Sequence, residues 1–344
     1  MIHTRRLTRH FRVKDQTVEA VRGIDLDVEE GELVAFLGPN GAGKSTTLRM
    51  LTTLLRPTAG TAEVAGCDVV GDPAGVRQRI GSIGQGNGAG HNQRVSDELV
   101  NQGRCYGLGR RDAEARADEL LASLGLAELA GRVVNTLSGG QRRRLDIALG
   151  MVHRPGLLFL DEPSTGLDPH NRANLKDHIE RLRAEHGTTI VLTTHYLDEA
   201  DSLADRVVVV DHGRVIADGT PQGLKSELVG DRLAVTAIDE ADASRVAAAI
   251  RRLGRPQAVE VDGAAVTARV RDAASLLPEL LRVLDTGDVP VAAAEVARAT
   301  LDDVFLALTG RSLRESAVAA EPPPAAEPAG AVTATTPVLE EQAS

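Results

Sequence analysis

The chain has 344 residues, of which 39 are basic and 49 are acidic, giving a net charge of −10 at pH 7. This balance and an aromatic content of 2% argue against a protein that coats nucleic acid, because that work needs basic surfaces or stacking platforms. The chain has only two cysteines, which excludes a disulfide scaffold, and they lack the spacing of metal ligands. No apolar run reaches the roughly 18 residues of a membrane span, and the start lacks a secretory signal. We therefore expect a cytosolic chain without direct membrane insertion.

Residues 1–222 are predicted to form an α/β domain, because short apolar runs alternate with helical patterns. The runs are continuous and bounded by Gly, Asp or Thr, which is typical of strands buried on both faces of a mostly parallel sheet. The predicted strands are Leu33–Leu37, Leu157–Leu160, Ile190–Leu192 and Val207–Val210, and helical patterns cover Asp112–Leu124 and Asn174–Glu185.

The first strand leads into a glycine-rich segment that matches G-x-x-x-x-G-K-[ST] and opens a helix near Lys44. Its glycines let successive backbone N–H groups converge on phosphate oxygens, and the helix N-terminus adds positive potential. In such a loop Lys44 reaches the β- and γ-phosphates, and the hydroxyl of Ser45 is a ligand of Mg²⁺. The predicted phosphate-binding residues are Gly38, Pro39, Asn40, Gly41, Ala42, Gly43, Lys44, Ser45 and Thr46.

A second candidate anion site lies at Leu137–Gln141, which reads Leu-Ser-Gly-Gly-Gln and precedes the helical pattern Arg142–Val152. Ser138 is a candidate N-cap, and the two glycines leave backbone amides bare, as in a phosphate-binding helix start. The chain thus carries two such helix starts but one phosphate cradle. This arrangement makes sense if Ser138 and Gly140 face a nucleotide that another copy of the chain holds.

The strand Leu157–Leu160 ends in two acids, Asp161 and Glu162. A carboxylate at the C-terminal end of a parallel strand lies beside the phosphate loop, where Mg²⁺ needs a ligand, and we assign that role to Asp161. Glu162 lies one residue further on and can polarise a water that attacks the γ-phosphate. A solvated acidic turn is the alternative, and the phosphate loop in the same chain disfavours it.

From about residue 232 the predicted elements follow the order β-α-β-β-α-β, which is typical of a split-βαβ module. Pro278 is expected to kink or shorten the helix predicted at residues 273–285. Residues 313–344 hold five of the 15 prolines, and such a stretch is predicted to be disordered. The predicted organisation is a nucleotide-binding domain at 1–222, an α+β accessory domain at 223–312 and a disordered tail at 313–344.

With the Leu-Ser-Gly-Gly-Gln string in place, residues 1–222 resemble the nucleotide-binding subunit of ATP-binding-cassette (ABC) transporters, which has a P-loop NTPase fold. The resemblance implies that Phe11 stacks on adenine, that Gln85 senses Mg²⁺ and the membrane partner, and that His195 contacts the γ-phosphate. The expected catalytic residues are Glu162, His195 and Lys44, and the expected Mg²⁺ ligands are Ser45, Gln85 and Asp161. Beyond the phosphate loop, the expected nucleotide contacts are Phe11, Gln85, Ser138, Gly139, Gly140, Gln141, Asp161 and the D-loop residue Asp168.

Three further strings are similar to the daunorubicin-resistance type of drug-efflux ATPase within this family, namely residues 143–148, 193–200 and 301–310. That group also carries a C-terminal accessory module. Residues 86–94 depart from its pattern because they are unusually rich in glycine, and they fall where the resemblance places contact with the membrane partner.

The resemblance implies a homodimer that hydrolyses ATP with Mg²⁺ and powers a separate membrane-spanning permease from the cytoplasmic side of the cell membrane. The expected cargo is a drug or antibiotic, with lipid or glycan export as the alternative. A soluble ABC ATPase that acts on ribosomes or DNA is the runner-up, although the single cassette lacks the insertions of those groups. An importer subunit is a further alternative. A P-loop kinase is disfavoured, because that function does not account for the Leu-Ser-Gly-Gly-Gln string.

Overall fold

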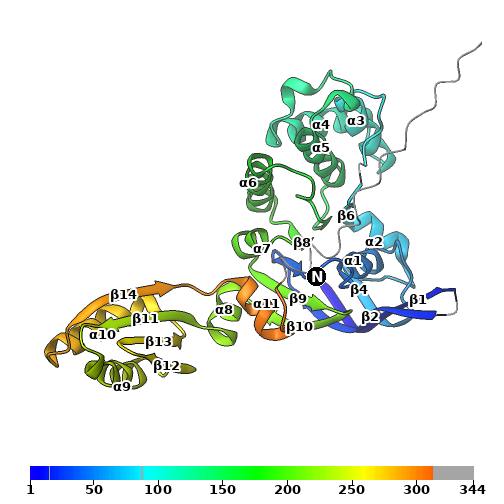
Figure 1. Ribbon diagram of the computed structural model, residues 1–344. Coiled ribbons are helices and arrows are strands. Elements are labelled where there is room, and N and C mark those ends of the chain that lie inside the picture. The colour runs from blue at the N-terminus through cyan, green and yellow to red at the C-terminus, as the bar shows by residue number, and fades with distance from the viewer. Residues whose placement is uncertain (15, 87, 313–344) are drawn as a thin grey trace, which may run out of the picture.

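The computed structural model describes residues 1–14, 16–86 and 88–312. Figure 1 shows two sheets with flanking helices at the centre, a group of helices above them, and a small module that extends to one side. The tail predicted to be disordered, 313–344, lies outside the described residues.

The central sheet holds the predicted apolar strands. Its six strands follow the order β10-β9-β3-β8-β7-β6, and neighbours are parallel except for the β9–β10 hairpin. Every residue of β3, β7 and β8 is buried, which explains why these strands read as unbroken apolar runs. The bounds are β3 Leu33–Leu37, β6 Ile80–Ile83, β7 Leu157–Asp161, β8 Thr189–Thr194, β9 Arg206–Asp211 and β10 Arg214–Gly219.

A second, antiparallel sheet in the order β2-β1-β4-β5 was not predicted. Its register shifts between Thr4 and Leu7, and again between Arg9 and His10. Each shift breaks the alternation of buried and exposed positions, so the strand lacks the period-2 pattern by which a strand is found. The helices α1 and α2 belong to this part of the fold. The bounds are β1 Ile2–Val13, β2 Gln16–Val28, α1 Lys44–Leu51, β4 Ala59–Val64, β5 Cys67–Asp68 and α2 Pro73–Arg79.

Two of the predicted helices begin earlier in the chain than their apolar patterns do. The helix predicted from Arg142 begins at Gly139, because Ser138 and Gln141 form a reciprocal capping box. The helix predicted from Asn174 begins at Pro169, because the Asp168 side chain caps it. The bounds are α3 Val95–Cys105, α4 Arg110–Ser123, α5 Gly139–Met151, α6 Pro169–His186 and α7 Leu197–Leu203, with short 3₁₀ turns at Ala127–Leu129 and Val134–Thr136.

The side module has the predicted β-α-β-β-α-β order. Its four strands form an antiparallel sheet in the order β12-β13-β11-β14, and α9 and α10 pack on it. Pro278 lies inside α10 without shortening it, because Leu276, Leu280 and Leu284 hold the helix in the apolar core of the module. The bounds are β11 Asp231–Ala237, α9 Ala243–Gly254, β12 Ala258–Asp262, β13 Ala265–Val270, α10 Ala273–Thr286 and β14 Val291–Ala297, with a 3₁₀ turn at Glu240–Asp242.

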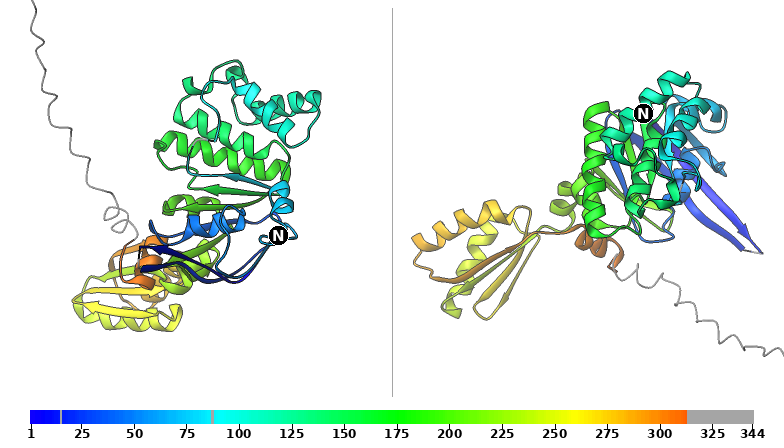
Figure 2. Two further views of the ribbon diagram at one scale, coloured as in Figure 1. Left: turned by 90° about the vertical axis from the view of Figure 1, so that its right-hand side faces the viewer. Right: turned by 90° about the horizontal axis from the view of Figure 1, so that it is seen from above.

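Two helices join the module to the rest of the chain, α8 (Pro221–Leu228) and α11 (Leu301–Thr309). Figure 2 shows the module standing apart from the rest of the fold, which holds the first two sheets and the helices α1 to α7 and is called the cassette below. The helix α11 lies against this larger part. Both helices pack on one another and belong to the apolar core of the central sheet rather than to that of the module. The division at residue 222 stays a prediction. Among the described residues, no helix is both long and apolar enough to cross a bilayer.

Candidate functional site

The glycine-rich loop after β3 surrounds a cavity of about 380 Å³. Two of its glycines are required by close contacts. A Cβ at Gly38 would collide with the carbonyl oxygen of Val210, and one at Gly43 would collide with that of Ala20. Gly43 also has φ 105°, in the left-handed region. The cavity is lined by Ala20, Asn40, Gly41, Ala42, Gly43, Lys44, Ser45, Thr46, Gln85 and Glu162.

Lys44 folds back over this loop. Its Nζ donates to the carbonyl oxygens of Gly38 at 2.6 Å and Pro39 at 3.1 Å, and lies 3.8 Å from Oε1 of Glu162. Burial lowers the pKa of Lys44, against the opposing effect of the Glu162 carboxylate. The ammonium group is therefore held at the cavity by carbonyl and carboxylate oxygens, which are groups that a phosphate could replace as its partner.

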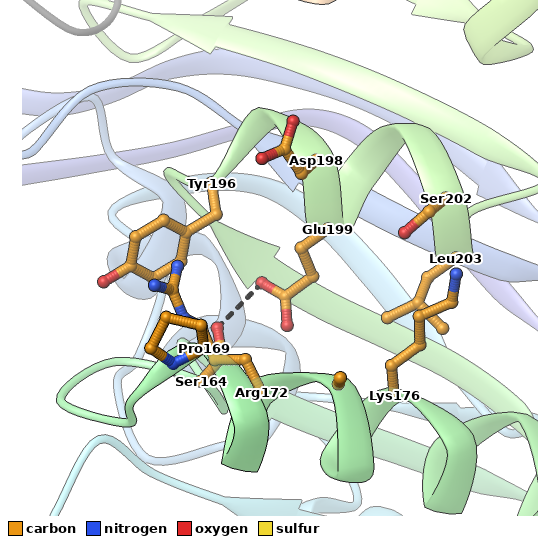
Figure 3. A pocket seen from close by; sticks show the side chains of 10 residues that line it. Ser164, Pro169, Arg172, Lys176, Tyr196, Asp198, Glu199, Ser202 and Leu203 are labelled. Carbon is orange, nitrogen blue, oxygen red and sulfur yellow. Dashed lines mark hydrogen bonds between the residues drawn. The ribbon is translucent and has the colours of Figure 1, made fainter.

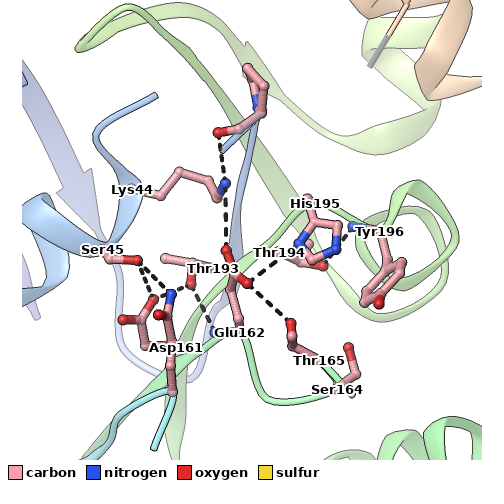
Figure 4. Close-up of polar contacts among 12 residues, drawn as sticks. Lys44, Ser45, Asp161, Glu162, Ser164, Thr165, Thr193, Thr194, His195 and Tyr196 are labelled. Atoms are coloured by element: carbon pink, nitrogen blue, oxygen red, sulfur yellow. Dashed lines mark hydrogen bonds and ion pairs between the residues drawn. The ribbon is translucent and has the colours of Figure 1, made fainter. Parts of the chain in front are cut away.

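The three residues predicted to ligate Mg²⁺ are joined by hydrogen bonds, and Figure 4 shows Ser45 beside Asp161. Ser45 Oγ donates to Asp161 Oδ1 at 2.7 Å, and Gln85 Nε2 donates to Ser45 Oγ at 3.1 Å. The three come from α1, the end of β7 and the segment after β6, so only the parallel sheet brings them together. Sequence analysis missed Thr193 of β8, whose Oγ1 donates to the same Asp161 oxygen at 2.6 Å. Its signal was its place at the end of the strand that leads to His195.

Glu162 is held by two groups that approach the same carboxylate oxygen (Figure 4). Thr165 Oγ1 donates to Oε2 at 3.0 Å, and His195 Nδ1 lies 3.4 Å from Oε2. The contact with His195, followed by the charge of Lys44, lowers the pKa of Glu162 despite the opposing effect of burial. The carboxylate is thus kept ionised beside the loop. Sequence analysis missed Thr165.

The backbone at Glu162 is strained. Its φ is 48°, a left-handed value that a residue with a side chain adopts at a cost of about 1–3 kcal/mol. The neighbouring strand holds it there, because the Glu162 N–H donates to the Thr193 hydroxyl at 2.9 Å and faces the Thr193 carbonyl oxygen at 3.2 Å.

The Leu-Ser-Gly-Gly-Gln string at Leu137–Gln141, called the signature from here on, lies at the start of α5. In the described part of the chain its residues do not line the cavity. Gln141 N–H donates to Ser138 Oγ at 3.3 Å, and Ser138 N–H donates to Gln141 Oε1 at 2.9 Å. A Cβ at Gly140 would press on the side chain of Asn171, whose amide group donates to Asp168 at 2.6 Å. Asp168 thus caps α6 beside the signature, and Gly139 is exposed.

Residues 21–165 match the sequence family described as ABC transporter. A daunorubicin resistance ATP-binding protein of Streptomyces coeruleorubidus is 46% identical to the chain over 293 residues, which are 85% of this chain and 90% of that protein. The chain belongs to the ABC transporter family. It is an ATP-binding protein and an ATPase, so the predicted fold class and activity are confirmed.

A daunorubicin/doxorubicin resistance ATP-binding protein of Streptomyces peucetius is 46% identical to this ABC ATPase over 306 residues, which are 87% of the chain and 92% of that protein. Among solved structures, a dimeric ATP-binding cassette bound to ADP and Pi superposes with a TM-score of 0.59. It covers 64% of this chain and 98% of its own, at 24% identity, and shows the shared fold.

Phe11 is the predicted adenine contact of this ABC ATPase. Phe11 lies on β1 opposite Val18, with the Arg9 guanidinium 4.8 Å from its ring centroid, and is absent from the residues lining the cavity in the described part of the chain. Its contact with adenine stays a prediction.

At the metal position, the carboxylate of Asp161 and the hydroxyl of Ser45 suit Mg²⁺, which takes few protein ligands and completes its shell with phosphate and water. Gln85 turns its NH₂ group to Ser45, so its amide would have to rotate for the oxygen to reach the ion.

Proposed function

We propose that two copies of this chain bind Mg²⁺ and ATP between them and power a separate membrane permease that exports a drug or antibiotic. The observation that carries the dimer is the position of the signature. The capped start of α5 offers bare amides suited to a phosphate, yet lies outside the cavity that holds the phosphate loop. A related cassette whose structure is a dimer with ADP and Pi supports the same arrangement.

The side chains around the cavity divide the work of hydrolysis. Lys44 leaves its carbonyl partners to bind the β- and γ-phosphates, and Ser45, Gln85 and Asp161 hold Mg²⁺. Held by these residues, Mg²⁺ would supply positive charge that offsets the negative charge of the phosphates. Each charge-assisted hydrogen bond to phosphate contributes about 1.5–3 kcal/mol, so several together can drive two copies to close.

Glu162 and His195 act on the γ-phosphate side of the site. The Glu162 carboxylate, kept ionised beside the loop, orients the attacking water and accepts its proton. His195 shares an oxygen of Glu162 and holds the γ-phosphate in line. Hydrolysis cuts the γ-phosphoryl group from ADP, and once inorganic phosphate leaves the site the charge that links the two copies is lost, so they separate.

Contact with the permease is assigned to the face around Gln85 and α3. A cavity of about 170 Å³ opens there between the glycine-rich segment after β6 and the helices α3 and α5. Glu98, Tyr106 and Asp146 are among the residues that line it. Closure and separation of the two copies would move this face at the cytoplasmic side of the membrane, where the chain is a peripheral subunit.

The dimer is tested by sedimentation of the Glu162→Gln chain, which binds ATP without consuming it. We expect monomers without nucleotide and dimers with ATP. Adding Ser138→Arg is expected to abolish the dimer while ATP affinity of the monomer stays the same. Ser244→Arg, at an exposed serine on α9, is the matched control and should dimerise. A Glu162→Gln chain that stays monomeric at saturating ATP contradicts the proposal.

The cargo is proposed from the two relatives, which are named for resistance to daunorubicin and doxorubicin. The test is expression of the chain, together with a candidate membrane-spanning permease, in a drug-sensitive bacterium. Intracellular daunorubicin should fall, and the Glu162→Gln chain should restore its accumulation. Unchanged accumulation with an active ATPase would argue for another cargo, such as a lipid or glycan.

A further inference from the structure

A partly buried carboxylate, Glu199, lies behind the catalytic groups on α7, the helix that follows β8 and His195. Ser164 Oγ donates to its Oε2 at 3.1 Å, and Ser164 itself is only 3% exposed. The Thr194 side chain also acts on this carboxylate and opposes the effect of burial on its pKa. Figure 3 shows Glu199 pointing from α7 toward Ser164 across the space between α6 and α7. The carboxylate therefore ties α7 to a segment that lies 35 residues earlier in the sequence.

Each partner of Glu199 is next in sequence to a group that contacts Glu162. Ser164 precedes Thr165, whose hydroxyl donates to Glu162 Oε2 at 3.0 Å. Thr194 precedes His195, whose Nδ1 lies 3.4 Å from the same oxygen. Thr165 and His195 meet at the carboxylate of Glu162 (Figure 4). Glu199 bonds to the residue before Thr165 from the helix that follows His195.

We infer that Glu199 is a positioning residue that sets the separation of Thr165 and His195, and through them the aim of the Glu162 carboxylate. The inference rests on the proposed roles of Glu162 and His195. Glu199 acts through its neighbours in this inference: its carboxylate accepts a hydrogen bond from Ser164, and in the described chain it does not line the phosphate-loop cavity. It lines a separate cavity of about 270 Å³ with Arg172 and Tyr196.

The surroundings of Glu199 suit a fixed clamp. Burial raises the pKa of Glu199, while its bonds to Thr194 and Ser164 and the charges of His195 and Arg172 oppose that rise. Arg172 is itself held, with its guanidinium 4.7 Å from the centroid of the Tyr196 ring. The Ser164 hydroxyl needs an acceptor at this position, and a glutamine side chain can supply one, because its amide oxygen accepts a hydrogen bond as a carboxylate oxygen does.

The test compares Glu199→Ala with Glu199→Gln. We expect Glu199→Ala to lower kcat by about tenfold or more, because the Glu162 carboxylate loses its orientation. The KM for ATP and the nucleotide affinity should change by less than about twofold, because the groups that bind ATP are kept. Glu199→Gln should recover most of kcat. Asp198→Asn, at the exposed neighbour on α7, is the matched control. A Glu199→Ala enzyme with the kcat of the native chain, or a Glu199→Gln enzyme as slow as Glu199→Ala, overturns the inference.

A double-mutant cycle with Ser164→Ala separates positioning from general destabilisation and serves if Glu199→Ala folds poorly. Ser164→Ala alone should lower kcat in the same way, and the double variant should be no slower than the slower single one, because both remove the same link. Losses in kcat that multiply would refute the link. Full turnover by Glu162→Gln would refute the proposed role of Glu162. That result is independent of the double-mutant cycle, which tests only the link between Glu199 and Ser164.

Discussion

At the scale of single residues, the site concentrates its constraints on Glu162. The sequence placed this carboxylate after an apolar strand, but its backbone conformation depends on bonds from Thr193 of the neighbouring strand. Strain of this kind persists only where surrounding structure holds it. The result is a side chain that turns away from the strand direction and toward Lys44 and His195.

A substitution at Glu162 should separate binding from hydrolysis. Glu162→Gln keeps the size and the bond to Thr165 but removes the base, so turnover should fall by about 10²–10⁴-fold. ATP affinity should stay the same or rise. The measurement is phosphate release in single turnover beside equilibrium binding of a fluorescent ATP analogue. Glu185→Gln, at an exposed carboxylate on α6, is the matched control and should hydrolyse ATP at the native rate. Hydrolysis at the native rate by Glu162→Gln would contradict the assignment.

At the scale of elements, His153 fastens the end of α5 to its neighbours. Its Nε2 lies 3.0 Å from the carbonyl oxygen of Ile80 in β6, and its ring stacks on that of Tyr106 at 3.8 Å between centroids. Burial lowers its pKa below the ordinary value of 6.5. The neutral imidazole is therefore the form that the folded state favours, while the unfolded chain takes up a proton more readily.

This shift makes stability depend on pH. Because the folded-state pKa of His153 is lowered, the free energy of unfolding should fall as pH drops below 6.5 and stop falling once pH is below the folded-state value. His153→Gln should show a smaller slope in urea unfolding between about pH 5.5 and 7.5. Burial also lowers the pKa of His178, so part of the slope should remain. His91→Gln, at an exposed site, should keep the native slope.

At the scale of the whole molecule, the C-terminal module is held at both of its ends. The chain leaves the cassette through α8 and returns through α11, where Phe305 is fully buried in the core of the central sheet. Arg311, just beyond α11, donates to both oxygens of Asp211 at 2.8 and 3.0 Å. The two helices that flank the module are thus fixed to the core of the central sheet.

The return helix should stabilise the cassette measurably. Phe305→Ala removes a fully buried ring and should lower the free energy of unfolding by about 3–5 kcal/mol. Leu306→Ala, at a neighbour that is 46% exposed, should change it by less than about 0.5 kcal/mol. Urea unfolding of both variants decides the point. Equal effects would show that α11 contributes nothing specific to the cassette.

The amino-acid sequence by itself determined the phosphate loop, the signature, the carboxylate pair and the apolar strands, because each is a contiguous string with its own local geometry. The parallel order of the strands also let the sequence predict that Ser45 and Asp161 meet, across 116 residues. Only the tertiary structure decided that Thr193 holds Glu162 and that Glu199 bonds to Ser164. It also decided that α11 packs into the core of the cassette. The physical reason is range: periodicity and capping act within one or two turns of chain, whereas these contacts depend on which strands become neighbours in the sheet.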